Sequence, residues 1–152
     1  MNERSTQHAT FVIDRHFDAP PQRVFAAWAT REAKSRWFAG PGEWIEKERA
    51  FDFRAGGHER LVGTWPGGRV SAFDARYFDI VANERIVYAY EMHVDGTKIS
   101  VSLATVEFNP AGDGTRLTVT EQGAFLDGYD DAGSRERGTR ELLDKLASTL
   151  RP

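Results

Sequence analysis

The feature that most constrains the fold is one long amphipathic segment at the end of a chain whose other segments resemble strands. Between Gly128 and Leu150, apolar side chains recur at helical spacing while most charged side chains occupy other positions. The recurring positions are Leu142, Leu143, Leu146 and Leu150. An antiparallel sheet needs a second layer over its apolar face, and only this segment is long enough to supply it. The sequence therefore predicts an α+β protein whose curved sheet wraps around a C-terminal helix and leaves a gap between the two layers.

The rest of the chain has the pattern of one strand, two short helices and six further strands. Ala9 to Phe17 alternates between apolar and polar residues and predicts the first strand. Asp18 to Pro21 predicts the start of a short helix, with Asp18 as its N-cap, and a second short helix is expected from about Arg31 to Phe38. From Trp44 to Gln122 the chain is nearly all strand, interrupted by turn residues, so successive strands should pair antiparallel.

Composition narrows the class of protein. A chain of 152 residues is expected to form a single domain, 1–152, with residues 1–7 frayed. The 20 basic and 23 acidic side chains form no basic stripe, which argues against a nucleic-acid partner. Cysteine is absent and the four histidines lie in no metal-binding motif, so we expect no metal site and no cofactor. Because no apolar run or signal peptide is present, we expect a cytoplasmic protein without membrane insertion.

Several short segments, taken in order, resemble one known family. They are Phe17–Pro21 with Val24-Phe25, Trp37–Pro41, Asp52–Gly57, Glu84–Tyr88 and Gly114–Thr120. The chain is thus similar to the START-like superfamily, also called SRPBCC, and to its branch named after the activator of heat-shock-protein-90 ATPase. The resemblance implies the helix-grip fold: a seven-stranded curved antiparallel sheet around a long C-terminal helix, with two short helices between strands one and two. It also implies an internal cavity, because members bind lipids, hormones or polyketides and some are cyclases or hydratases.

Strand alternation predicts which side chains face the gap between sheet and helix. Glu59 shares a face with Leu61, and Glu121 shares a face with Val119, so both carboxylates are expected on the concave side. A bulge near Phe78 would reverse which side chains of that strand face the gap and which face outward. Phe125 and Tyr129 fall in the loop expected before the last helix, where they either form an entrance gate or, as the favoured interpretation, simply anchor the loop. The candidate ligand-binding residues are Glu59, Tyr77, Tyr88, Tyr90, Met92, Glu121, Phe125, Leu142 and Leu146.

Three functions remain open. The first is a small-molecule binding protein for an apolar or aromatic ligand. The second is an enzyme of cyclase or hydratase type, in which Glu59 and Glu121 would transfer protons. The third is a protein-interaction module related to chaperone ATPase activation. The glutamates also have plainer interpretations, either solvated at strand ends or paired within the structure. A homodimer through an edge strand is a further expectation, since an open sheet leaves edges to cover. The chaperone activator carries another domain, which we do not expect in this chain, so a chaperone partner is not favoured.

Details of the last helix give further expectations. Asp131 is expected to be its N-cap, and Arg135, Arg137 and Arg140 are expected on its exposed side. Gly138 costs about 1 kcal/mol relative to alanine inside a helix, and close approach of the helix to the sheet would explain it. Many relatives carry Gly-Trp at this point, whereas here the next residue is a threonine. The aromatic cluster Trp28, Trp37, Phe38 and Trp44 is interpreted as core or lid packing.

Overall fold

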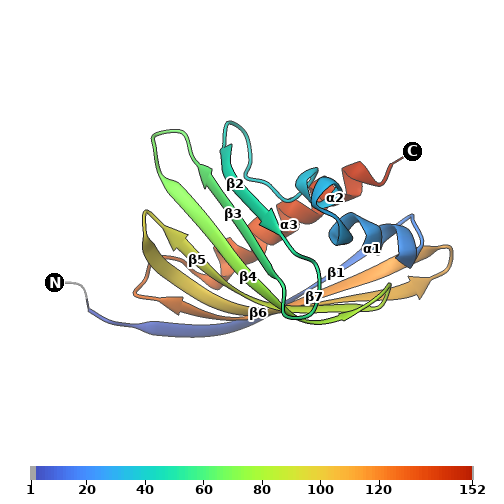
Figure 1. Ribbon diagram of the computed structural model, residues 1–152. Helices are drawn as coiled ribbons and strands as arrows, with labels where there is room; N and C mark the ends of the chain where they lie inside the picture. Colours follow the sequence, from blue (N-terminus) through green and yellow to red (C-terminus); the bar gives the residue numbers. More distant parts are fainter. Residues whose placement is uncertain (1–2, 152) are drawn as a thin grey trace.

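The computed structural model describes residues 3–151, which form a seven-stranded antiparallel sheet and three helices (Figure 1). The strands are β1 (Thr6–Phe17), β2 (Ile45–Phe51), β3 (His58–Thr64), β4 (Val70–Val81), β5 (Arg85–Val94), β6 (Thr97–Ala111) and β7 (Gly114–Leu126). The helices are α1 (Pro21–Ala29), α2 (Arg31–Ser35) and α3 (Ala132–Thr149). The strand order is β1-β7-β6-β5-β4-β3-β2. Strands β2 to β7 therefore pair in sequence order, whereas β1 pairs with β7 instead of β2. The predicted helix-grip architecture is confirmed.

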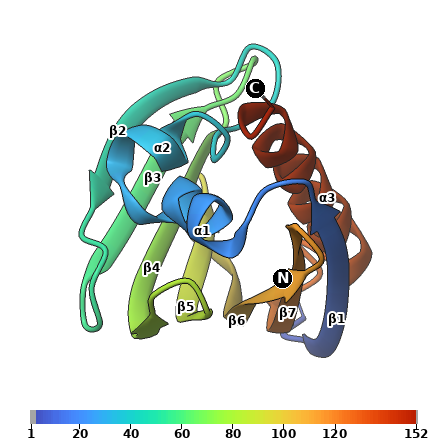
Figure 2. The ribbon, with the colours of Figure 1, turned by 90° about the vertical axis from the view of Figure 1, so that its right-hand side faces the viewer.

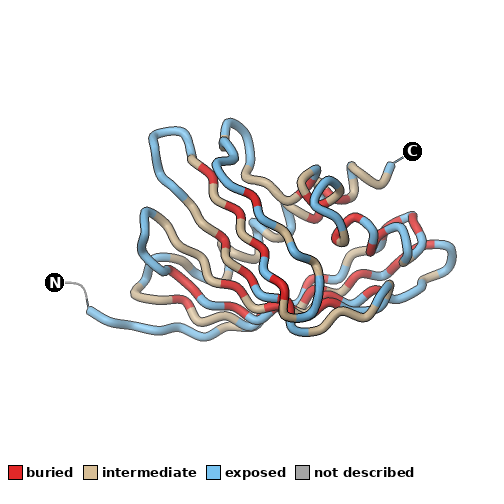
Figure 3. The backbone as a smooth tube through the Cα atoms, viewed as in Figure 1, coloured by how far each residue is buried: buried red, intermediate tan, exposed pale blue. Residues whose placement is uncertain are grey.

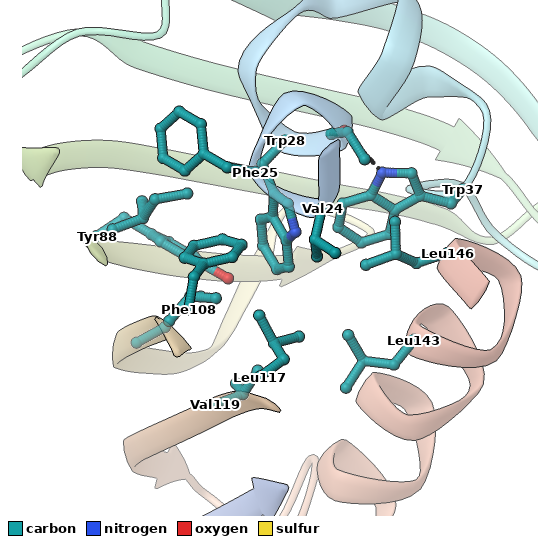
Figure 4. Close-up of a cluster of buried hydrophobic side chains, with 14 of the residues drawn as sticks. Val24, Phe25, Trp28, Trp37, Tyr88, Phe108, Leu117, Val119, Leu143 and Leu146 are labelled. Atoms are coloured by element: carbon teal, nitrogen blue, oxygen red, sulfur yellow. Dashed lines mark hydrogen bonds between the residues drawn. The ribbon is translucent and has the colours of Figure 1, made fainter. Parts of the chain in front are cut away.

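All three helices lie on the concave side of the bent sheet, with α3 over the β1 end and α2 close to β2 (Figure 2). Buried and exposed residues alternate along most strands (Figure 3), because successive side chains of a strand point to opposite faces. The inner faces meet the apolar side of α1 and of α3 (Figure 4). Val24 and Trp28 of α1 pack there near Leu143 and Leu146 of α3. The predicted two-layer core is therefore present.

The first helix begins differently from the prediction. Its N-cap is Pro20, which makes no side-chain capping bond, and Pro21 is its first residue. Asp18 is therefore not the cap, and the fixed φ of the prolines starts the helix without one. The second helix ends at Ser35 rather than near Phe38, and Thr30 caps it by accepting from the Ala33 amide.

The ends of the long elements also differ from the sequence expectation. Helix α3 begins at Ala132, because Asp127 and Gly128 adopt left-handed φ values of 54° and 72° that turn the chain out of β7. Asp131 is its N-cap, as predicted, and accepts from the Ser134 amide at 2.8 Å. Strand β1 begins at Thr6, which pairs with Leu126 of β7, so residues 6–7 are not frayed. Residues 1–2 of the expected frayed segment lie outside the described residues.

A bulge interrupts the pairing of β4 with β5 between Tyr77 and Asp79. It lies after Tyr77, so the alternation from Phe73 onward is kept and Tyr77 points inward with 1% of its surface exposed. Inward-facing and outward-facing side chains are therefore not exchanged in the part of the strand before the bulge. The next residue, Phe78, is 54% exposed on the outer face.

Candidate functional site

A cavity of about 340 Å³ lies between the sheet and α3. Strands β3, β4, β5 and β7, helices α1 and α3, and the connection between α2 and β2 all contribute to its wall. Its volume falls at the lower end of the range common for small-molecule sites. The aromatic part of the wall consists of all four tryptophans, Trp28, Trp37, Trp44 and Trp65, with Phe38, Phe73, Tyr88 and Tyr90. The aromatic cluster near the short helices thus both packs the core and borders open space.

Gly138 lies on the cavity wall in the middle of α3. A Cβ atom built at this position would meet no heavy atom within 4 Å. The expectation that close approach to the sheet explains this glycine is therefore wrong. A glycine inside a helix costs about 1 kcal/mol relative to alanine, and here that cost has no packing reason. Gly138 is exposed, so the open space beside it lies at the rim of the cavity.

Two other glycines shape the opposite side of the cavity around Trp44. A Cβ at Gly63 of β3 would lie 1.9 Å from the Trp44 indole, and one at Gly40 would lie 2.3 Å from it. The indole therefore packs directly on the two glycine backbones, which fixes its position beside the cavity. An isolated glycine inside a strand is the sequence signal for such a close approach.

Glu121 of β7 is the buried carboxylate of the cavity wall, with 4% of its surface exposed. Its Oε1 accepts a hydrogen bond from the Tyr90 hydroxyl of β5 at 2.5 Å. The Thr139 hydroxyl of α3 lies 3.4 Å from its Oε2. Burial raises the pKa of Glu121, while the bonds from Tyr90 and the nearby charge of Arg135 oppose that rise. A carboxylate at this point of the wall can accept hydrogen bonds from a bound molecule.

Arg135 supports this network from the first turns of α3. Its Nη1 donates to the Tyr90 hydroxyl at 3.0 Å, and its Nη2 donates to Ser100 at 2.8 Å and to Asp130 at 2.9 Å. Its side chain is only 12% exposed, so the expectation of an exposed arginine is wrong. The sequence held a signal for this, because Arg135 precedes Thr139 by four residues and shares the helix face that meets the sheet.

Glu59 of β3 belongs to a second, separate network. Its Oε1 lies 2.5 Å from the Lys34 ammonium of α2 and accepts a hydrogen bond from the Tyr77 hydroxyl at 2.5 Å. All three residues are almost fully buried, with exposed fractions of 2%, 2% and 1% for Glu59, Lys34 and Tyr77. Burial lowers the pKa of the lysine, although the charge of Glu59 opposes this, and burial raises the pKa of the tyrosine.

Sequence reasoning missed Lys34, the cation that pairs with Glu59. The signal available was spacing, since Lys34 precedes Trp37 and Phe38 by three and four residues and would share a face with them on the helix predicted to run to Phe38. Its ammonium lies 4.5 Å from the centre of the Phe38 ring, which forms part of the cavity wall. The cation is thus held behind the aromatic wall rather than at the surface of the cavity.

The candidate residues therefore divide into two groups. The cavity is lined by Tyr88, Tyr90, Met92, Glu121 and Leu142. The residues that lie outside its lining are Glu59, Tyr77, Phe125 and Leu146. Both glutamates point inward as alternation predicted, but they bond to different partners, and only Glu121 borders the cavity. The Phe125 ring instead packs against the Arg135 guanidinium, at 5.4 Å from its centre.

The raised pKa of Glu121 gives a testable dependence of stability on pH. A carboxyl group whose pKa is higher in the folded than in the unfolded chain destabilises the fold once it ionises, and this effect vanishes at low pH. We expect Glu121→Gln to raise the free energy of unfolding at pH 7, and the gain to shrink at pH 4. Urea denaturation at both pH values measures it, with Glu107→Gln on the exposed face of β6 as the matched control. An equal gain at both pH values, or a loss at pH 7, would contradict this assignment.

Two further observations concern the described part of the chain. None of the helices within residues 3–151 combines the length and apolar character needed to cross a membrane. In the same range, no three His, Asp or Glu side chains converge as a group that could hold a metal ion.

The chain matches known proteins over most of its length. Residues 18–151 match the family described as activator of Hsp90 ATPase homolog 1-like protein. A solved protein from Rhizobium leguminosarum is 51% identical with a TM-score of 0.91, and the match covers 95% of each chain. The protein Mll3558 from Rhizobium loti is 46% identical with a TM-score of 0.89, and the match covers 96% of this chain and 99% of that one.

A more distant structure supports the same fold. The AHSA1-like protein from Aeromonas hydrophila is 18% identical with a TM-score of 0.69, covering 92% of this chain and 90% of that one, which shows likeness of fold alone. No curated protein matches the chain. The match over residues 18–151 nevertheless decides the family, and the chain belongs to the activator of Hsp90 ATPase homolog 1-like proteins.

Proposed function

We propose that this protein binds a small, mainly apolar molecule in the cavity between the sheet and α3. The observation that carries the proposal is the cavity itself, an open space of about 340 Å³ bordered by eight aromatic side chains. Gly138, exposed at the rim, leaves that side of the cavity open, although alanine there would add about 1 kcal/mol to stability.

The composition of the cavity wall favours an apolar and aromatic ligand. Its aromatic rings offer flat faces for stacking, and Met92 and Leu142 add apolar surface that adapts to shape. Polar groups gather on the α3 side, around Glu121 and Arg135. A mostly apolar wall with a few convergent polar groups is the usual composition of a small-molecule site. Proton transfer shared by Glu59 and Glu121 receives no such support, because Glu59 is paired with Lys34 outside the lining.

Fluorescence tests the proposal directly, because every tryptophan of the chain lines the cavity. Titration with the neutral, environment-sensitive dye 6-propionyl-2-dimethylaminonaphthalene should quench tryptophan emission and shift the dye emission to shorter wavelength. Leu142→Trp replaces an aliphatic side chain of the wall by a larger indole ring. It should weaken dye binding by roughly tenfold or more, equivalent to about 1.4 kcal/mol.

The matched control is Leu103→Trp on the outer face of β6, where the leucine is 41% exposed. This variant should bind the dye as the unmodified protein does. Absence of dye binding to the unmodified protein would contradict the proposal, as would equal weakening by both substitutions.

A further inference from the structure

We infer that the ligand carries a hydrogen-bond donor, a hydroxyl or N–H group, at the end that meets Glu121, and that the cavity rejects anionic ligands. This inference rests on the proposed function and specifies the class of molecule that the same cavity takes. It follows from the hydrogen bonds available to each oxygen of Glu121 and from the charges around it.

The two carboxylate oxygens of Glu121 are unequally satisfied. Oε1 accepts the Tyr90 hydroxyl at 2.5 Å, a short bond to a charged acceptor. Among the described residues, the Thr139 hydroxyl is the one hydrogen-bonding partner of Oε2, at 3.4 Å. That distance is well beyond the usual 2.5–3.0 Å range for a hydrogen bond between two oxygens.

The Thr139 hydroxyl is also committed elsewhere. It has one hydrogen, and it lies 3.0 Å from the Arg135 carbonyl oxygen one turn earlier in α3, closer than Glu121. It can donate to only one of these acceptors, and the shorter distance favours the carbonyl. Oε2 is therefore a buried carboxylate oxygen on the cavity wall without a firm donor from the described residues around it. Leaving a charged acceptor unpaired in a buried site is costly, so a donor on the ligand gains more there than in water.

The charges of the cavity wall oppose an anionic ligand. Arg135 is the nearest cation, but its guanidinium already bonds to Asp130, Ser100 and the Tyr90 hydroxyl. Lys145, the other cation of the wall, donates to the backbone carbonyls of Ala39 and Gly40. A ligand carboxylate placed beside Glu121 would therefore meet a like charge, while both cations already have partners. A neutral or cationic donor meets no such penalty.

Three probes of similar size separate these requirements: 2-naphthol, 2-methylnaphthalene and 2-naphthoate, each measured by displacement of the bound dye. They differ in carrying a donor, no polar group, or a negative charge. The unmodified protein should bind 2-naphthol at least tenfold more tightly than 2-naphthoate. Glu121→Leu should weaken 2-naphthol roughly 10- to 100-fold, the usual worth of a hydrogen bond to a charged group, and change 2-methylnaphthalene less than threefold.

A second substitution keeps the test independent of the stability of Glu121→Leu. Glu121→Gln removes the charge but keeps an acceptor oxygen, so it should retain part of the preference for 2-naphthol and bind 2-naphthoate more tightly than the unmodified protein does. The inference is overturned if Glu121→Leu weakens 2-naphthol and 2-methylnaphthalene equally, or if 2-naphthoate binds the unmodified protein as tightly as 2-naphthol. If neither the dye nor any probe binds, the proposed function itself is wrong and the inference falls with it.

Discussion

Replacing Lys34 by methionine should lower the free energy of unfolding by roughly 3–5 kcal/mol, the cost typical of removing one partner of a buried ion pair. Methionine keeps the length of the side chain but leaves Glu59 charged and buried, with Tyr77 as its one remaining donor among residues 3–151. The loss should be larger than usual for a surface lysine, because Lys34 is 2% exposed and its partner is 2% exposed. Urea denaturation followed by circular dichroism measures it.

Two comparisons separate the broken ion pair from a general effect of the substitution. Lys47→Met, at an exposed lysine of β2, should change stability by less than about 0.5 kcal/mol. The triple variant Lys34→Met, Glu59→Leu, Tyr77→Phe removes all the polar partners together and should recover most of the loss. Recovery is expected because Glu59 Oε2 already lacks a partner in the described chain, so the native network is incompletely satisfied. If Lys34→Met lowers the free energy of unfolding no more than Lys47→Met does, the buried pair does not have the stabilising role described here.

Gly138→Phe should abolish most ligand binding while leaving the protein folded. Gly138 is exposed at the rim of the cavity, and the new ring should occupy the open space there, in the way of a bound molecule. Displacing one buried ring of the ligand forfeits roughly 2–3 kcal/mol of apolar burial, so dye affinity should fall roughly 30- to 160-fold. Thermal unfolding should occur at or above the temperature of the unmodified protein, because phenylalanine is a better helix former than glycine.

Gly138→Ala is the graded control for this prediction. Its methyl group meets no atom within 4 Å, so it should raise stability by about 1 kcal/mol and reduce dye affinity only slightly. Unchanged dye affinity in Gly138→Phe would place the bound dye outside the cavity. Loss of folding in both variants would show that the glycine has a structural role after all.

The parts of the fold that sequence predicted are those governed by local pattern. Alternation along β5 correctly places Ile86, Tyr88 and Tyr90 on the inner face, because the period of two follows from the strand alone. The leucine stripe of α3 correctly faces the sheet, with Leu143 and Leu146 buried. Short turns predicted the pairing of successive strands, but local pattern does not predict that β1 pairs with β7.

The parts that sequence missed depend on contacts between distant segments. Lys34 bonds to Glu59, 25 residues away, and Arg135 bonds to Ser100, 35 residues away. Charged residues on a short or polar helix resemble solvated ones until their partners are known, since an isolated charge is seldom buried. The prediction for Gly138 erred in the opposite direction. A glycine inside a helix suggested close packing, but this glycine borders open space.

The cavity as the binding site is tested most directly by a crystal structure of the protein with 6-bromo-2-naphthol, in which anomalous scattering locates the bromine. We expect one bromine peak between the sheet and α3, among Trp28, Trp37 and Phe38, with the hydroxyl of the same molecule within hydrogen-bonding distance of Glu121 Oε2. A peak on the outer face of the sheet, or a cavity that remains without the compound at saturating concentration, would contradict it.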